Sequence, residues 1–157
     1  MLNSADPDLS AFQQRGGKLI LYHGWLDAAI TAQNTIDYYR NVQQKMGERV
    51  AENFLRLYMV PGMQHCAGGP GPFIFGQLGP GGATRRTTPF SAQEQWVEKR
   101  QASGAIIAAK QNDDHDPAKG IRMTRPLCPY PQSAIYTGSG NANDAASFTC
   151  KAVNFSR

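Results

Sequence analysis

Two short apolar runs flank an amphipathic stretch near the start of the chain, and this pattern predicts a strand, a helix and a second strand. Residues 18–24 (KLILYHG) are too few for a helix and are bounded by glycines, which indicates a buried strand. Over residues 31–46, apolar side chains recur every three or four positions, and Gly47 follows as a helix stop signal. Residues 53–60 (NFLRLYMV) form the second run. This order is typical of a right-handed parallel crossover.

The pattern is less regular after the second run. Residues 67–83 contain seven glycines and three prolines, which predicts a long irregular surface loop, and loops of this length are often functional. Residues 91–94 (SAQE) fit a capping box at the start of a helix that carries Trp96 and Val97 inward. Residues 105–110 predict a further short strand.

Composition favours one packed domain. The chain has 157 residues, of which 41% are hydrophobic and 18% charged, and its net charge is +4. The basic residues are scattered and form no stripe, so we expect no nucleic-acid partner. No apolar stretch approaches the roughly 18 residues that a membrane span requires, so we expect no membrane partner. Residues 1–15 have neither a basic nor an apolar region, so we expect no secretory signal there.

Three cysteines, an odd number, change this picture. Cys128 and Cys150 lie in a stretch rich in Pro, Gly, Ser and Asn, where little regular structure is expected. A disulfide between them would close a loop of about 23 residues and stabilise the fold by about 3 kcal/mol. It would imply an oxidising compartment and leave Cys66 without a partner. A natural protein that extends further at its N-terminus would explain both the oxidising compartment and the unpaired Cys66. The alternative is three inert buried thiols in a cytosolic protein.

Asp27 and His65 are the candidates for proton transfer. Each follows a predicted parallel strand, and function in open parallel sheets collects at the carboxyl ends of strands. A carboxylate that accepts the Nδ1–H of an imidazole fixes its tautomer and stabilises the imidazolium. In α/β-hydrolases the catalytic acid and then the base follow late strands, after the nucleophile, and Asp27 and His65 occur in the same order. The alternatives are that Asp27 caps the following helix and that His65 is an ordinary loop histidine.

A nucleophile to match this pair is missing. No Gly-x-Ser-x-Gly sequence occurs, and Ser139, between two glycines, follows no predicted strand. Cys66 is adjacent to His65, but neighbours on an extended loop point apart, and a catalytic dyad is assembled from separate segments.

Metal and phosphate sites are not indicated. His23, His65 and His115 fit no zinc-ligand spacing, and residues 113–116 (DDHD) predict a turn. The glycine-rich residues 68–72 lack the lysine of a phosphate-binding loop, and their prolines lack N–H donors.

Several segments of the chain together form a recognisable pattern. They are DPDLS (6–10), GGKLILYHGWLD (16–27), QNTIDYY (33–39), MVPGMQHCAGGPG (59–71), WVEK (96–99), TRPLCPYP (124–131) and NDAASFTC (143–150). These segments closely resemble the C-terminal part of the tannase/feruloyl esterase family of secreted α/β-hydrolases. The resemblance covers nearly the whole chain, and its HGWLD and PGMQHC segments are specific.

The resemblance implies roles for individual residues. Asp27 matches the acid and His65 the base of the family's Ser-His-Asp triad. Cys66 matches a cysteine that the family bridges to one just before the nucleophilic serine, and Cys128 and Cys150 match a C-terminal disulfide. The serine, the oxyanion hole and the lid domain with its calcium site belong to an N-terminal portion that this sequence lacks, so no cofactor is expected in residues 1–157.

We therefore expect an α/β fold, the C-terminal portion of an α/β-hydrolase sheet with parallel strands, crossover helices and long irregular loops. The resemblance implies a secreted or periplasmic parent protein that hydrolyses small aromatic esters such as those of gallate or ferulate. The chain alone would supply only Asp27 and His65 and be inactive. An exposed sheet edge would then favour homo-oligomers. The alternatives are a non-catalytic module that binds phenolic or sugar ligands through residues 67–83, and a half-enzyme completed by another chain.

Overall fold

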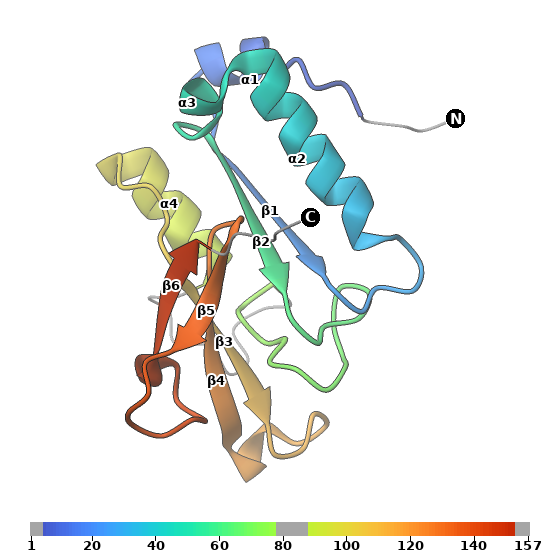
Figure 1. Cartoon of the computed structure of the whole chain (residues 1–157), viewed down its shortest axis with the longest axis vertical. Coiled ribbons are helices and arrows are strands. Elements are labelled where there is room, and N and C mark those ends of the chain that lie inside the picture. Colours follow the sequence, from blue (N-terminus) through green and yellow to red (C-terminus); the bar gives the residue numbers. More distant parts are fainter. Residues whose placement is uncertain (1–4, 78–87, 153–157) are drawn as a thin grey trace.

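A computed structural model of the chain describes residues 5–77 and 88–152. Helices and strands alternate in the first half, and strands dominate the second (Figure 1). The elements are α1 (Ser10–Gln14), β1 (Leu19–Gly24), α2 (Ala32–Met46), α3 (Glu48–Ala51), β2 (Leu55–Val60), α4 (Pro89–Lys99), β3 (Ile106–Gln111), η1 (Pro117–Lys119), β4 (Ile121–Leu127), β5 (Gln132–Tyr136), η2 (Ala145–Ser147) and β6 (Phe148–Ala152).

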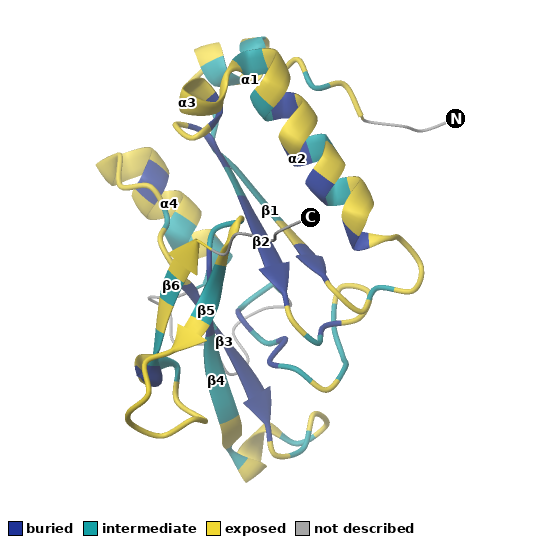
Figure 2. Ribbon diagram, viewed as in Figure 1, coloured by how far each residue is buried: buried dark blue, intermediate teal, exposed yellow. Residues whose placement is uncertain are grey.

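The predicted strand–helix–strand unit is confirmed. β1 and β2 pair in parallel, with Leu19 opposite Leu55 at one end and Gly24 opposite Val60 at the other. Helix α2 connects them and ends where Gly47 adopts a φ of 86°. Figure 2 shows the buried positions of α2 turned toward the two strands. The predicted α/β class is confirmed as well.

Strand β2 is buried on both faces, because its side chains alternate between two hydrophobic clusters. Leu55, Leu57 and Met59 pack in one cluster with the apolar face of α2. Tyr58 and Val60 point the other way, into a second cluster formed with β3, β4 and the segment after β2. A strand that is apolar at almost every position is therefore required here.

The C-terminal half is built from antiparallel pairs, β3 with β4 and β5 with β6. The expectation of little regular structure around Cys128 and Cys150 is wrong, because β5 and β6 form a ladder in which Ala134 lies opposite Cys150. Cys128 and Cys150 form a disulfide, with Cα atoms 5.6 Å apart. The bridge joins this ladder to the end of β4.

Helix α4 starts earlier than the sequence pattern indicated. Its cap is Thr88, whose side chain accepts from the Ser91 N–H while the Ser91 hydroxyl accepts from the Thr88 N–H. The predicted capping box at residues 91–94 is wrong, since a proline at the first helical position and an extended residue before it place the start at Pro89. Trp96 is buried as expected, but Val97 is 54% exposed.

Part of the predicted surface loop belongs to the core. Phe73 and Phe75 are buried, and Ile74 exchanges two backbone hydrogen bonds with Ala109 of β3. The prediction of an irregular surface loop is therefore wrong for residues 73–75, and residues 78–83 lie outside the described part. Residues 113–116 form a turn, as predicted.

Within the described ranges, no helix combines the length and apolar character that crossing a membrane would require.

We expect the Cys128–Cys150 disulfide to contribute about 3 kcal/mol to the free energy of unfolding, because it restricts a loop of about 23 residues in the unfolded chain. Replacing both cysteines by serine should lower the denaturant midpoint, and reducing agent should lower the midpoint of the parent chain equally. Cys66→Ser is the matched control, because Cys66 is exposed and free among the described residues. Equal midpoints for the double variant and this control would contradict the expectation.

Candidate active site

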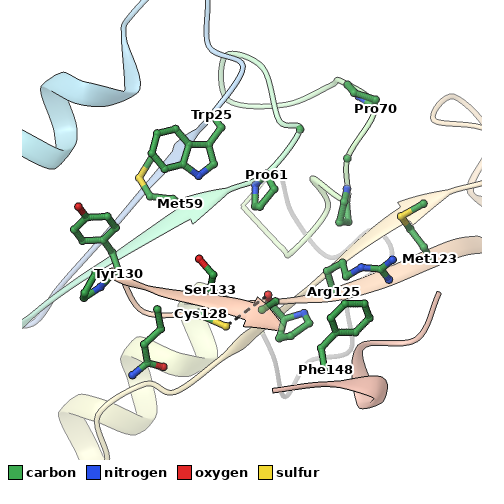
Figure 3. Close-up of a pocket in the computed structure, with 17 residues that line it drawn as sticks. Trp25, Met59, Pro61, Pro70, Met123, Arg125, Cys128, Tyr130, Ser133 and Phe148 are labelled. Atoms are coloured by element: carbon green, nitrogen blue, oxygen red, sulfur yellow. Dashed lines mark hydrogen bonds between the residues drawn. The ribbon is translucent and has the colours of Figure 1, made fainter. Parts of the chain in front are cut away.

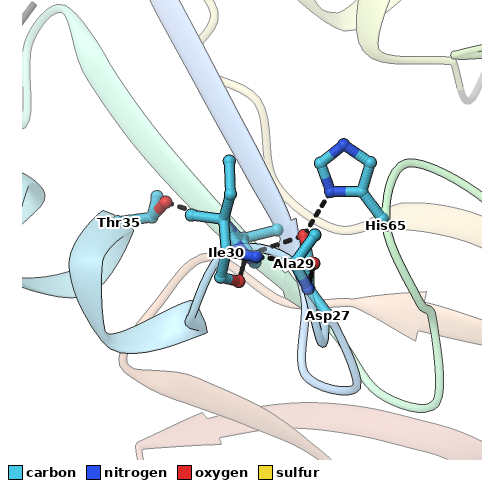
Figure 4. A network of polar contacts seen from close by, with 6 residues as sticks. Asp27, Ala29, Ile30, Thr35 and His65 are labelled. Carbon is cyan, nitrogen blue, oxygen red and sulfur yellow. Dashed lines mark hydrogen bonds and ion pairs between the residues drawn. The ribbon is translucent and has the colours of Figure 1, made fainter. Parts of the chain in front are cut away.

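The parallel pairing of β1 and β2 places the segments that follow them at one edge of the sheet. The first segment carries Asp27 and the second carries His65 (Figure 4). A backbone hydrogen bond of 2.9 Å from the Leu26 N–H to the Met63 carbonyl joins the two segments. The residues that the sequence proposed for proton transfer therefore lie side by side, although 38 positions separate them.

Gly24 makes this approach possible. A Cβ atom at position 24 would lie 2.5 Å from the Gln64 carbonyl oxygen and closer still to that of Met63. The segment after β2 passes directly over the backbone of Gly24, where any side chain would push it away. The last position of β1 must therefore be glycine for Asp27 and His65 to meet.

Glycines also shape the segment that carries His65. Gly62 has a φ of 75° and Gly69 a φ of 99°, values that residues with a Cβ rarely adopt. The Gly71 N–H donates to the Gly62 carbonyl at 3.2 Å, and Cβ atoms at any of these three positions would collide with backbone. The glycine-rich stretch thus folds back on the turn after β2 and closes the loop that carries His65.

The buried side chain of Lys110, on β3, contacts this glycine-rich stretch. The Lys110 ammonium of β3 donates to the Gly69 carbonyl at 2.7 Å and lies 2.5 Å from Asp114. It also sits 4.7 Å from the centre of the Phe73 ring. Lys110 therefore ties the antiparallel half of the molecule to the segment that carries His65.

The Asp27 carboxylate is saturated with hydrogen bonds. Oδ1 accepts from the Ala29 N–H at 2.9 Å and from the Ile30 N–H at 3.0 Å, while Oδ2 lies 2.8 Å from His65 Nδ1. The bond from Ile30, and then those from His65 and Ala29, outweigh the opposing effect of burial and lower the pKa of the Asp27 carboxyl to about 2. Asp27 is therefore ionised throughout the neutral range. The alternative that Asp27 caps the following helix is wrong, because its hydrogen bonds are to the turn before α2 and the N-cap of α2 is Thr31.

The partner of His65 determines the imidazole tautomer. An ionised carboxylate only accepts, so Nδ1 of His65 carries the proton in its contact with Asp27. In the neutral ring this leaves the lone pair on Nε2. The Asp27 side chain is 5% exposed, whereas that of His65 is 54% exposed and Nδ1 is the ring nitrogen that it turns toward Asp27. This arrangement suits a general base.

A second histidine contacts Asp27. His23 Nε2 lies 3.3 Å from Asp27 Oδ2, on a side chain that is 9% exposed. From the sequence, His23 was considered only as a metal ligand, and its contact with Asp27 was missed. The feature of the sequence that points to this contact is the spacing of four residues between His23, at the end of a predicted buried strand, and Asp27.

Other residues singled out in the sequence lie elsewhere. Cys66 is exposed, next to His65, and has a φ of 61°. His115 lies in the exposed turn after β3 and takes no part in the pair. Within residues 5–77 and 88–152, no group of three or more His, Cys, Asp or Glu side chains is arranged to hold a metal ion.

A cavity of about 510 Å³ begins at Trp25, two residues before Asp27 (Figure 3). It extends between the end of β2 and the C-terminal strands, and its lining includes Pro70 and Pro72 of the glycine-rich stretch. Most lining side chains are apolar, and Arg125 is the charged one among them. Such a cavity is large enough for a small organic molecule.

The family model described as "Tannase and feruloyl esterase" matches residues 1–151. The chain belongs to the tannase and feruloyl esterase family. The resemblance seen in its sequence segments is thereby confirmed.

Relatives within the family match nearly all of this chain. An uncharacterized esterase from Xanthomonas campestris pv. campestris is 43% identical over 96% of this chain and 28% of its own length. A mono(2-hydroxyethyl) terephthalate hydrolase from Piscinibacter sakaiensis is 46% identical over 92% of this chain and 21% of its own length. The crystal structure of feruloyl esterase B from Aspergillus oryzae has a TM-score of 0.80 and 32% identity over 93% of this chain and 29% of its own. The chain thus spans less than a third of these family members.

We expect Gly24→Ala to separate Asp27 from His65, because the added methyl group displaces the segment after β2. A crystal structure of the variant should show the Nδ1–Oδ2 distance beyond hydrogen-bonding range. Gly104→Ala is the control, since nothing lies within 4 Å of a Cβ at that position. An unchanged distance in Gly24→Ala would show that the two segments tolerate the side chain.

We expect Asp27 to stabilise the fold in a pH window set by its lowered pKa. A carboxyl whose pKa falls from about 3.9 in the unfolded chain to about 2 in the fold stabilises fully above the first value and loses its effect as the pH falls through the second. Urea denaturation of the chain and of Asp27→Asn should give a stability difference that shrinks as the pH falls below the unfolded value. A difference that grows toward low pH would contradict this sign.

Proposed function

We propose that this chain supplies the acid and the base of a Ser-His-Asp carboxylic ester hydrolase. The observation that carries the proposal is the 2.8 Å contact between Asp27 Oδ2 and His65 Nδ1, combined with the exposed side chain of His65. The membership of the tannase and feruloyl esterase family supports the reaction class.

In this mechanism His65 transfers protons and Asp27 holds it in place. As a serine hydroxyl attacks the ester carbonyl, His65 Nε2 takes its proton and then gives it to the leaving alcohol. The same nitrogen next removes a proton from water as the water attacks the acyl-enzyme, and it returns this proton to the serine oxygen when the acyl–oxygen bond breaks and the acid is released. Asp27 remains ionised throughout, keeps the proton of neutral His65 on Nδ1 and stabilises the imidazolium.

The serine is proposed to come from outside these 157 residues, either from a longer parent chain or from another chain. Large apolar side chains around the Asp27 turn are exposed, and they offer a surface for that part: Tyr22, Trp25, Leu26 and Ile30. In the described residues β1 pairs with β2 alone, so its other edge can accept a further strand, or a second copy of this chain. The exposed Cys66 thiol beside His65 suits the family's bridge to the cysteine that precedes the serine.

The proposed substrates are esters of aromatic acids such as gallate or ferulate. Two relatives carry names that specify a feruloyl and a terephthalate ester, both with aromatic acyl groups. The Cys128–Cys150 disulfide supports a parent protein that is secreted or periplasmic. A structural calcium ion, if the parent has the family's lid domain, would lie outside residues 1–157.

A chimera tests this function. We expect the purified chain to leave methyl ferulate and methyl gallate intact, and a Xanthomonas esterase whose matching segment is replaced by this chain to hydrolyse at least one of them. In that chimera, Asp27→Ala and His65→Ala should each lower kcat by roughly 10³-fold or more.

The matched control is His115→Ala, because His115 is an exposed histidine away from the pair. The proposal fails if the folded chimera is inactive, or if the Asp27 and His65 variants retain the activity of the control.

The cavity at Trp25 favours a second candidate function, a non-catalytic module that binds phenolic or sugar ligands. Its lining includes Pro70 and Pro72, which belong to the loop proposed for such binding. Calorimetric titration of the chain with ferulate, gallate and their sugar esters separates the two functions. Binding that survives Asp27→Ala and His65→Ala in a monomeric chain would support the module.

A further inference from the structure

The Asp27 carboxylate lies between two histidines that differ in exposure. Its Oδ2 atom is 2.8 Å from Nδ1 of the exposed His65 and 3.3 Å from Nε2 of the buried His23. The proposed reaction uses only His65, so the buried imidazole has no assigned task.

The other contacts of His23 define its protons. Nε2 lies 3.0 Å from the Ile30 carbonyl oxygen as well as near Asp27, and both of these groups only accept. Nε2 must therefore carry a hydrogen. Nδ1 lies 2.7 Å from the Thr35 hydroxyl, which can donate to it. The surroundings thus fit a neutral His23 with its proton on Nε2 and each ring nitrogen paired.

These contacts close a ring of interactions around the catalytic carboxylate. The Ile30 N–H donates to Asp27 Oδ1 (Figure 4). The carbonyl of the same residue accepts from His23 Nε2. Through Thr35, the imidazole is also attached to the first turn of α2. His23 therefore connects β1, the Asp27 turn and α2, and it contacts the carboxylate oxygen that faces His65.

We propose that His23 is a positioning residue for the Asp27–His65 pair. It keeps the turn from Asp27 to Ile30 closed and directs Oδ2 toward His65 Nδ1, so that neutral His65 stays in the Nδ1–H tautomer. Asp27 then has one buried partner that fixes its orientation and one exposed partner that exchanges protons. The inference rests on the proposed function for its role in a reaction, but the positioning itself is measurable without turnover.

Nitrogen NMR of the imidazoles in the isolated chain tests the positioning. At about pH 8.5, two units above the ordinary imidazole pKa of about 6.5, long-range ¹H–¹⁵N spectra distinguish the two neutral tautomers. We expect the parent chain to show His23 with its proton on Nε2 and His65 with its proton on Nδ1. Finding His23 in the Nδ1–H form would overturn the proposal without any variant, because Nε2 could not then donate.

Two substitutions separate the hydrogen bond from the volume of the ring. His23→Phe fills the space without a donor, and we expect His65 to shift toward the Nε2–H form that free imidazoles favour. His23→Gln keeps an N–H donor at the end of its side chain and should retain the Nδ1–H form of His65. An unchanged tautomer ratio in a folded His23→Phe chain would overturn the proposal. If His23→Phe does not fold, His23→Gln and the parent spectrum still decide it.

Kinetics in the chimera then measure the effect on the reaction. We expect His23→Phe to lower kcat by about 10- to 100-fold with little change in KM, as for other residues that orient a catalytic group, and His23→Gln to recover most of it. The two proposals can fail separately. If the chimera never hydrolyses esters but the folded His23→Phe chain shows the shifted His65 tautomer, the proposed function fails and the positioning role stands. Equal kcat values for His23→Phe and the parent chimera would overturn the catalytic significance of His23.

Discussion

The close approach of two backbone segments at Gly24 is the constraint on which the rest of the site depends. β1 and β2 are parallel and in register to their last residues, so the segments that follow them leave the sheet at the same edge. They can lie in contact only because position 24 has no side chain. Once they are in contact, a carboxylate and an imidazole from distant parts of the sequence meet at 2.8 Å. The side chains of Asp27 and His65 can therefore reach each other directly.

The Asp27 carboxylate lies between a buried histidine, His23, and an exposed histidine, His65. The amides of Ala29 and Ile30 donate to Asp27 Oδ1, and His65 Nδ1 contacts Oδ2. His23 Nε2 lies 3.3 Å from the same Oδ2 atom and donates to the Ile30 carbonyl. Because the hydrogen bonds to both oxygens stabilise the carboxylate, Asp27 stays ionised despite its low exposure.

The sequence predicted the parts of the structure whose causes are local or periodic. The short length of the two apolar runs identified β1 and β2, and the spacing of apolar residues identified α2, which in turn placed Asp27 and His65 at one edge. The short apolar run at residues 105–110 likewise identified β3. Its antiparallel pairing with β4 was not predicted, because pairing between Ile106 and Leu127 depends on distant partners and not on local pattern. The start of α4 was missed because Pro89 and Thr88 compete with the Ser91–Glu94 signal. The contact of His23 with Asp27 was missed, because a spacing of four residues brings the two side chains together only when the Asp27 turn folds back on β1.

β2 belongs to both hydrophobic clusters, and this has a consequence for how the molecule opens. Leu57 and Tyr58 are neighbours in the chain, yet they face different clusters, and both are fully buried. Neither cluster can be exposed to water without disturbing the strand that the other one needs. The amides of β2 should therefore exchange their hydrogens only when the whole described domain unfolds, so that it behaves as a single cooperative unit. His65, the proposed base, thus follows the slowest-opening element of the fold, although its own side chain is 54% exposed.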